Sequence, residues 1–263
     1  MDKWVRLVSM TVLMLMIGSW SVSHAQNLSQ DRTAMSWADQ QRMLSQRMAK
    51  NWVLLAHEAM RMEQRQQLTN SIVQFEQNLA QLSMYAQTNS GAWQGDLATL
   101  KGQWLVYREV LTKTPQRSLI PQLLAAADYT LKLSEQLVTS LKSAQNLGMT
   151  GVLLDVAGQQ SMLSQRIALL YATQTQFGQA GDIGVQYQQA IQSFVRGMKR
   201  LESFQGHSPR IKQTIAAVQT CWRFTEYVFQ QPRSLARVVD VNCEQLLNDL
   251  NAITSAYVVM DVR

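Results

Sequence analysis

Glycine, proline and cysteine are scarce in this 263-residue chain, which has 12 glycines, four prolines and two cysteines. Folds built from β-strands need turn-forming residues at short intervals, so this scarcity leaves little room for them. The rest of the composition is rich in Gln, Leu, Ala, Met and Ser. Such residues are mostly good or tolerated helix formers, and the composition therefore favours an all-α fold.

Motifs of the common enzyme classes are also absent. Beyond residue 25 the chain has two histidines, His57 and His207, and neither has a carboxylate or cysteine beside it at metal-ligand spacing. The pair His57-Glu58 lacks the second histidine of a metalloprotease helix, and there is no Gly-x-Ser-x-Gly, glycine-rich phosphate loop or Cys-x-x-Cys. The paired Glu-x-x-His motifs of a di-iron bundle are missing too. We therefore expect no enzyme activity, no bound metal and no cofactor.

Positive charge is in modest excess and is scattered. The chain has 24 Lys and Arg against 18 Asp and Glu, a formal net charge of +6. Nucleic-acid binding needs a clustered basic stripe, which the sequence does not show. A mildly basic surface suits small anions or an anionic membrane face, and we expect no nucleic-acid partner.

The N-terminus has the three-part layout of a secretory signal peptide. Lys3 and Arg6 precede an apolar run over residues 7–20, and the small residues Ser23 and Ala25 follow it. The apolar run is shorter than the roughly 20 residues of a comfortable membrane span. We therefore expect a signal peptide over the first 25 residues, cleavage after Ala25 and a periplasmic product. The alternative is an uncleaved anchor.

Apolar residues recur at three- and four-residue steps along most of the chain, as in Trp104, Tyr107 and Leu111. This spacing places them on one face of an amphipathic helix. Helices of about 25 to 30 residues indicate a long bundle. The eight expected helices span residues 30–63, 66–88, 93–114, 118–145, 150–177, 182–204, 209–230 and 234–259.

The second half of the chain repeats the first. The segment 41–49, Gln-Arg-Met-Leu-Ser-Gln-Arg-Met-Ala, returns as Gln-Ser-Met-Leu-Ser-Gln-Arg-Ile-Ala at 160–168, shifted by 119 positions. Trp104 returns as Trp222 at a shift of 118, and other matches keep the same order. We predict tandem antiparallel four-helix bundles, with one repeat over residues 26–146 and the other over 147–263.

The repeated block, with its core Met-Leu-Ser-Gln-Arg, resembles the signature of the extracytoplasmic N-terminal domain of type IV pilus methyl-accepting chemotaxis transducers. It also resembles the related helix of nitrate/nitrite sensor kinases. The family pattern is close to Asn-x-Ala-Gly-Arg-Gln-Arg-Met-Leu-Ser-Gln-Arg-Met-Ala-Lys. This chain departs from it at Gln40 and Gln159, which replace the first arginine, and at Ser161, which replaces the second.

The resemblance implies a sensory bundle whose ligand lies between two motif helices. In nitrate-sensing relatives these helices belong to two subunits, and the arginine before the methionine reaches a small anion. With two motif helices in one chain, we expect an internal pseudo-dimer and a monomer. A guanidinium between helices suits the oxygens of nitrate or a carboxylate. The expected ligand-binding residues are Arg42, Gln41, Ser45, Gln160, Ser161 and Ser164.

Other motif residues fit structural roles. Arg47 and Arg166 occur in both copies, and we expect them to contact carboxylates or carbonyls. Met43 and Met162 are expected in the core. Outside the motif, Cys221 and Cys243 flank the last predicted turn at similar distances, which leaves open either a disulfide or two buried thiols.

Together these features predict a periplasmic protein that binds a small anion or another small polar ligand. Without a signalling module of its own, it would pass occupancy to a membrane-bound receptor, kinase or cyclase. The alternative is an envelope scaffold or interaction protein whose ligand site is degenerate. Arg42 distinguishes the two, because a sensor needs its guanidinium free, whereas a scaffold should neutralise it with an internal acid.

Overall fold

The computed structural model describes residues 2–57, 62–145, 147–178, 182–231 and 235–260, with side chains described from residue 27 onward. All regular structure in these residues is helical, so the predicted all-α fold is confirmed. The elements are α1 (Asp2–Ala56), α2 (Met62–Thr88), α3 (Trp93–Thr112), η1 (Arg117–Leu119, a 3-10 turn), α4 (Ile120–Ala144), α5 (Gly148–Phe177), α6 (Ile183–Ser203), α7 (Pro209–Phe229) and α8 (Ala236–Val258).

Helix α1 differs most from its predicted bounds. It begins at Asp2 instead of residue 30 and ends at Ala56 instead of residue 63. No proline lies within these 55 residues to break the helix, so the chain continues through the segment expected to separate a signal peptide from the bundle. The predicted cleavage site after Ala25 lies among residues whose side chains are outside the described part. No helix in the described residues is long and apolar enough to cross a membrane.

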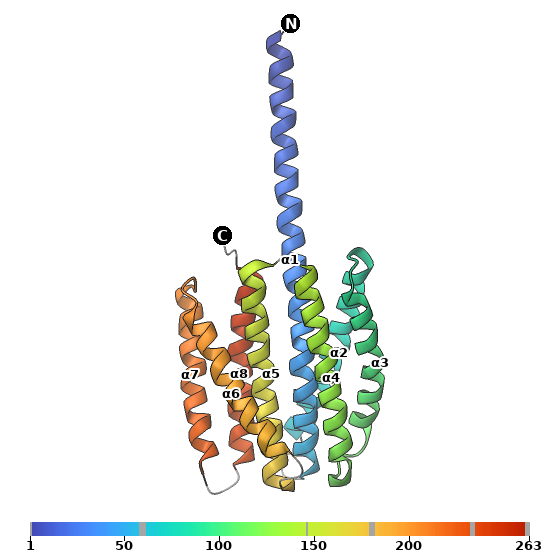
Figure 1. Cartoon of the computed structure of the whole chain (residues 1–263), viewed down its shortest axis with the longest axis vertical. Coiled ribbons are helices and arrows are strands. Elements are labelled where there is room, and N and C mark those ends of the chain that lie inside the picture. The colour runs from blue at the N-terminus through green and yellow to red at the C-terminus, as the bar shows by residue number, and fades with distance from the viewer. Residues whose placement is uncertain (1, 58–61, 146, 179–181, 232–234, 261–263) are drawn as a thin grey trace.

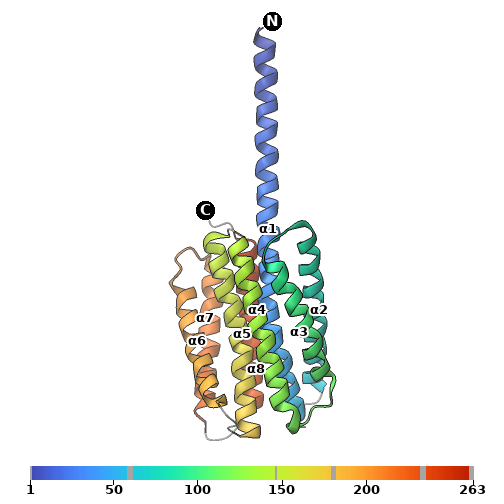
Figure 2. The same cartoon turned by 45° about the vertical axis from the view of Figure 1, so that its right-hand side comes forward.

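The helices form two groups that meet along α1 and α5. Helices α1 to α4 lie on one side and α5 to α8 on the other, and α1 and α5 are central in both views (Figures 1 and 2). The contact of α1 with α5 is the most extensive between any two helices of the described chain, as expected for a pseudo-dimer. The boundary between repeats at residues 146 and 147 stays a prediction, and residue 146 is outside the described part.

Local signals fix several helix ends. Ser208 precedes α7, and its hydroxyl accepts a hydrogen bond from the backbone N–H of Ile211 at 3.3 Å, while Pro209 occupies the first turn. A serine cap followed by proline is a common helix start, because proline has no N–H to leave unpaired there. Helix α5 ends at Phe177, and the φ of 84° at the following Gly178 is one that glycine adopts without strain.

The two groups repeat one another in their cores as well as in sequence. Phe75 packs on Trp104 with ring centroids 4.4 Å apart, and Phe194 packs on Trp222 at 4.3 Å. The pairs join α2 to α3 and α6 to α7, at positions 119 and 118 residues apart. Such aromatic pairs contribute about 0.5–1.5 kcal/mol beyond burial of their area. The duplication seen in the sequence is therefore also a duplication of packing.

Candidate functional site

The two motif serines bond to their own helices. The hydroxyl of Ser45 donates to the carbonyl of Arg42 at 2.7 Å, and that of Ser164 donates to the carbonyl of Ser161 at 2.8 Å. Both serines are fully buried. Each hydroxyl proton is thus used within its own helix, and neither serine lines a cavity described below.

The motif arginines Arg47 and Arg166 form equivalent ion pairs between the two groups. Arg47 on α1 donates to Glu244 of α8 through Nε at 3.0 Å and Nη2 at 2.6 Å. Arg166 on α5 donates through Nη1 to Asp128 of α4 at 2.5 Å. Arg47 and Arg166 are 119 positions apart, and their acids are 116 apart, matching the drift of the repeat. Each arginine thus ties its motif helix to the other group.

The motif glutamines Gln41 and Gln160 are both buried but differ in their hydrogen bonding. Gln41 Nε2 donates to the carbonyl of Phe75 at 3.0 Å. Gln160 has no hydrogen-bond partner for either amide atom within the described chain, and it packs against Gly197 of α6 so closely that a Cβ there would lie 1.9 Å from Nε2. Neither glutamine lines a cavity described below.

Arg42, the residue expected to hold an anion, is paired with two acids of the protein. It is 4 % exposed. Nη1 donates to Asp155 Oδ1 at 3.1 Å, Nη2 donates to the Asp155 carbonyl at 3.2 Å, and Nη2 also bonds the carboxylate of Asp39. Lys142 Nζ holds the other oxygen of Asp155 at 2.6 Å. An anion binding at Arg42 would therefore have to replace the carboxylates that already accept hydrogen bonds from its guanidinium.

The titration behaviour of this cluster follows from its burial. Burial lowers the pKa of Arg42, but Asp39 and Asp155 more than offset it, so the pKa is raised and the guanidinium stays charged. Burial likewise favours the neutral form of Asp155, yet Arg42 and Lys142 hold its pKa below the ordinary value. Asp39 is more deeply buried, and burial raises its pKa to about 7 despite Arg42. Asp39 is thus the cluster's acid that titrates near neutral pH.

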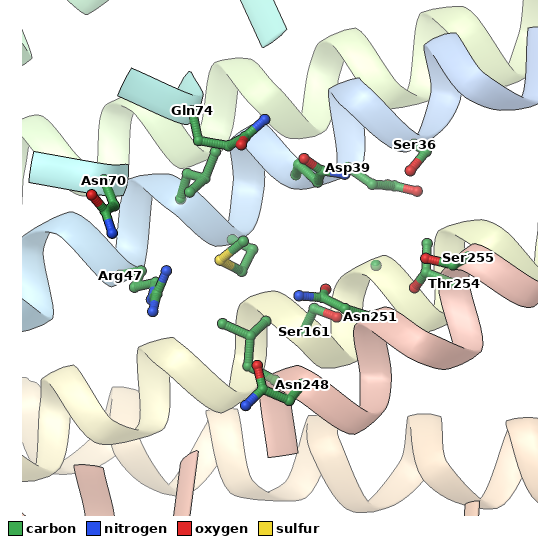
Figure 3. Close-up of a pocket in the computed structure, with 15 residues that line it drawn as sticks. Ser36, Asp39, Arg47, Asn70, Gln74, Ser161, Asn248, Asn251, Thr254 and Ser255 are labelled. Atoms are coloured by element: carbon green, nitrogen blue, oxygen red, sulfur yellow. The ribbon is translucent and has the colours of Figure 1, made fainter. Parts of the chain in front are cut away.

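We call Arg42, Asp39, Asp155 and Lys142 the Arg42 cluster. A cavity of about 310 Å³ opens on the other side of the α1–α5 contact from this cluster, between α1, α2, α5 and α8 (Figure 3). We call it the interface cavity. Its lining is mostly polar and neutral, with amide and hydroxyl groups from four helices. The lining residues are Ser36, Asp39, Gln40, Met43, Leu44, Arg47, Asn70, Gln74, Gly158, Ser161, Leu247, Asn248, Asn251, Thr254 and Ser255.

The interface cavity lies at the position that the Arg42 cluster occupies in the other half of the pseudo-dimer. Shifting Asp39 and Arg42 by 119 positions gives Gly158 and Ser161, and shifting Asp155 back by 119 gives Ser36. All three of these smaller residues line the cavity. One side of the α1–α5 contact is therefore filled by a buried ion-pair cluster, and the equivalent space on the other side is left open.

The flanking helices differ in the same way. At the shift of 116 that relates α4 to α8, Lys132 corresponds to Asn248 and Glu135 to Asn251. Glu135, which interacts with Arg42, is thus replaced by an amide that lines the cavity. The second amide, Asn248, stands where α4 has an exposed lysine. Amides offer both donors and acceptors without a net charge, so this side suits a ligand bound by hydrogen bonds.

A second cavity, of about 410 Å³, lies between α4, α5 and α6. It is largely apolar, with Ile120, Leu169 and Ile183 among its walls. At its rim Arg117 Nη2 donates to the carbonyl of Phe177 at 3.1 Å. The positions after the second motif copy line this cavity, but no motif residue does.

The remaining residues named from sequence have structural surroundings. Met43 and Met162 are buried, and Met43 also lines the interface cavity. Cys221 and Cys243 are free thiols in the structure, the former half-buried and the latter fully buried, and burial raises the pKa of both. The disulfide stays a prediction. Among the described residues, no group of three His, Cys, Asp or Glu side chains could hold a metal ion.

Of the six expected ligand-binding residues, Ser161 lines the interface cavity, and the other five do not. Sequence reasoning missed Asp39 on α1 and the α8 residues Asn251 and Thr254. The sequence did contain a signal for Asp39, because the equivalent position of the second motif copy is the much smaller Gly158. The α8 residues gave no such signal, since they lie outside the motif.

Residues 26–129 match the family described as the N-terminal domain of type IV pili methyl-accepting chemotaxis transducers. The predicted resemblance is thereby confirmed over α1 from residue 26 onward, α2, α3 and the start of α4. The second motif copy lies outside the matched range, and the relation to nitrate sensors stays a prediction. No curated protein and no solved structure matches the chain.

Proposed function

We propose that this protein is a ligand-binding sensory protein that holds a small molecule in the interface cavity. The match to a chemotaxis transducer domain points to a sensory role. The observation that carries the proposal is the cavity itself, which is bounded by both motif copies and opens where Ser161 replaces the motif arginine. A pocket with several converging polar groups at a helix–helix junction is the usual form of a small-molecule site.

Occupancy would be passed to a membrane-bound receptor, kinase or cyclase through the end of the bundle from which α1 projects. Helix α8, the last of the chain's described helices, ends at this same end (Figure 1). Arg32 Nη1 donates to the carbonyl of Met260 at 2.8 Å, which ties the last described residues to α1. Both α1 and α8 line the interface cavity, so a ligand there contacts the helices that reach this end. The periplasmic location expected from the sequence is part of this proposal.

A small anion such as nitrate is a weaker candidate at Arg42 than the sequence suggested. The guanidinium already bonds two carboxylates, and an anion would have to displace one of them. Asp155 is also held by Lys142, which makes displacement more costly. Nitrate and nitrite are therefore tested below as alternative ligands of the interface cavity.

The pairing of Arg42 supports a second candidate function, an envelope scaffold without a ligand. A scaffold is expected to neutralise this buried arginine with internal acids, and Asp39 and Asp155 do so. The open interface cavity favours the sensor, because a scaffold gains nothing from an unfilled polar space, and cavities destabilise a core.

A thermal-shift screen with Ser161→Gln tests the proposal. The panel contains nitrate, nitrite, carboxylates, amines, amides and purines. A ligand at about 100 times its Kd should stabilise by about 2.7 kcal/mol, a shift of several degrees in Tm. Glutamine at position 161 would fill the cavity and abolish the shift. The matched control is Ser143→Gln, because the Ser143 hydroxyl also donates to a carbonyl four residues earlier but is exposed.

A shift that Ser161→Gln abolishes and Ser143→Gln preserves supports the sensor. If no compound shifts the wild type, or if Ser161→Gln leaves every shift intact, the scaffold is the better description.

A further inference from the structure

We propose that the interface cavity binds a small organic cation with N–H donors, such as an amine, amidine or guanidine, through the carboxylate of Asp39. The inference rests on the proposed function and specifies the chemical class of its ligand. It follows from three features of the cavity, namely one incompletely paired acid, no available cation and a surplus of oxygen acceptors.

Asp39 is the incompletely paired acid. It lines the cavity and is 2 % exposed. One carboxylate oxygen bonds Arg42, while the other, Oδ2, has no hydrogen-bond partner within the described chain. A buried carboxylate oxygen without a donor is costly, and a ligand N–H beside it would remove that cost.

Among the described residues, the interface cavity is lined by no basic side chain that lacks an acidic partner. Its one basic lining residue is Arg47, whose guanidinium is engaged by both carboxylate oxygens of Glu244 at 3.0 and 2.6 Å. Lys50, which also bonds Glu244, is paired with Asp240 at 2.6 Å, so Arg47 and Lys50 are balanced by two acids. An anionic ligand would lie beside Asp39 with no free positive partner among the lining residues, which opposes its binding.

Charges around Asp39 leave room for one more cation. Three cations, Arg42 on α1, Lys142 on α4 and Arg166 on α5, face four acids. The acids are Asp39, Asp155 on α5, and Glu135 and Asp128 on α4. Burial raises the pKa of Asp39 and also that of Glu135, because the nearby cations do not fully offset the lost solvation of these carboxylates. A ligand cation next to Asp39 would restore the balance and hold its carboxylate ionised.

The other cavity walls supply acceptors for the remaining N–H groups. Asp39 and Ser36 on α1 face Ser161 on α5 and Asn251 and Thr254 on α8 across the opening (Figure 3). Hydroxyl and amide oxygens accept hydrogen bonds from ammonium and guanidinium groups without adding charge. Acceptors on both sides of the opening let one ligand bridge α1 to α5 and α8.

This arrangement predicts a specific pH dependence of binding. A cation prefers ionised Asp39, and below about pH 7 binding must first release its proton. Affinity should therefore rise about tenfold per pH unit below that value and level off above it, for a ligand that stays protonated throughout. In Asp39→Asn the group no longer titrates, so binding should be weaker and nearly independent of pH.

The experiment is calorimetric titration of the full protein between pH 5.5 and 8.5. The cationic probes are methylguanidine, benzamidine and putrescine, and the competitors are nitrate, acetate and acetamide. Each probe is tested on wild type, Asp39→Asn, Ser161→Gln and the control Asp249→Asn. Asp249 is on a wall helix, α8, but bonds only the side chain of Gln245 among the described contacts and does not line the cavity.

The expected result is binding of one or more cationic probes that rises with pH. It should weaken at least tenfold in Asp39→Asn, disappear in Ser161→Gln and persist in Asp249→Asn. Binding of only an anion or a neutral amide, lost in Ser161→Gln, overturns the cation but upholds the sensor. Equal affinity of Asp39→Asn and wild type for a cation also overturns the inference. If no probe of any class binds in the cavity, both the inference and the proposed function fail.

Discussion

The clearest stability prediction concerns the buried acid Asp39. Burial raises its pKa from 3.8 to about 7 in the folded protein. An acid with a higher pKa in the folded than in the unfolded state binds its proton more tightly when folded. Its contribution to stability is therefore complete below pH 3.8 and is lost as the pH rises through about 7. The neighbouring carboxylate of Asp155 has a lowered pKa and acts in the opposite direction.

The size of the effect can be worked out from the same shift. One pKa unit corresponds to about 1.36 kcal/mol, so a rise from 3.8 to about 7 corresponds to about 4 kcal/mol. Asp39→Asn removes this titration while keeping the shape of the side chain and an oxygen that accepts from Arg42. The difference in unfolding free energy, wild type minus Asp39→Asn, should thus decrease by about 4 kcal/mol between about pH 4 and pH 8.

Urea denaturation of the two proteins at each pH measures this difference. Effects of acids distant from Asp39 are common to both proteins and cancel when the curves are subtracted. A difference curve that stays flat to within about 1 kcal/mol, or one that rises with pH, would refute the argument. It would mean that Arg42 stabilises the charged form of Asp39 more than burial opposes it.

Two further predictions concern the packing around this acid. Arg42→Met removes a buried guanidinium from two carboxylates and should reduce the unfolding free energy by about 3–5 kcal/mol. The control Arg108→Met breaks an exposed ion pair and should reduce it by less than about 1 kcal/mol, so equal losses in urea titrations would contradict the prediction. Gly158→Ala places a Cβ 2.6 Å from Asp39 Cγ and should destabilise the folded protein. The control Gly102→Ala meets nothing within 4 Å and should stabilise its helix by about 0.5–1 kcal/mol, so a Tm of Gly158→Ala above that of wild type would contradict the close contact.

The fold was largely accessible from sequence because its signals are local. Apolar spacing of three and four residues predicts helices wherever it occurs, and the breaks between them coincide with prolines and glycines such as Pro209 and Gly178. The packing of α1 on α5 followed from the repeated motif. The start of α1 was predicted wrongly, because a signal-peptide pattern reports on export and carries no information about where the helix begins.

The site was accessible only in part, because its residues meet through tertiary packing. Asp39 lies three positions before Arg42, a spacing at which helical residues are neighbours, so their pairing was within reach of the sequence. Asp155 is 113 positions from Arg42 and becomes its partner only when α5 packs on α1. The same holds for Asn251 and Thr254, which reach the cavity from α8.

Duplication within one chain explains how such a one-sided site can exist. In a symmetric homodimer every substitution appears on both sides of the axis, so an arginine cluster and an open cavity could not occupy equivalent places. Here the two copies are free to differ, and Arg42 with its acids stabilises one side of the α1–α5 contact. Ser161 and Gly158 leave space on the other side. One copy can therefore hold a buried cluster of paired charges, while the other leaves an open cavity at the same helix contact.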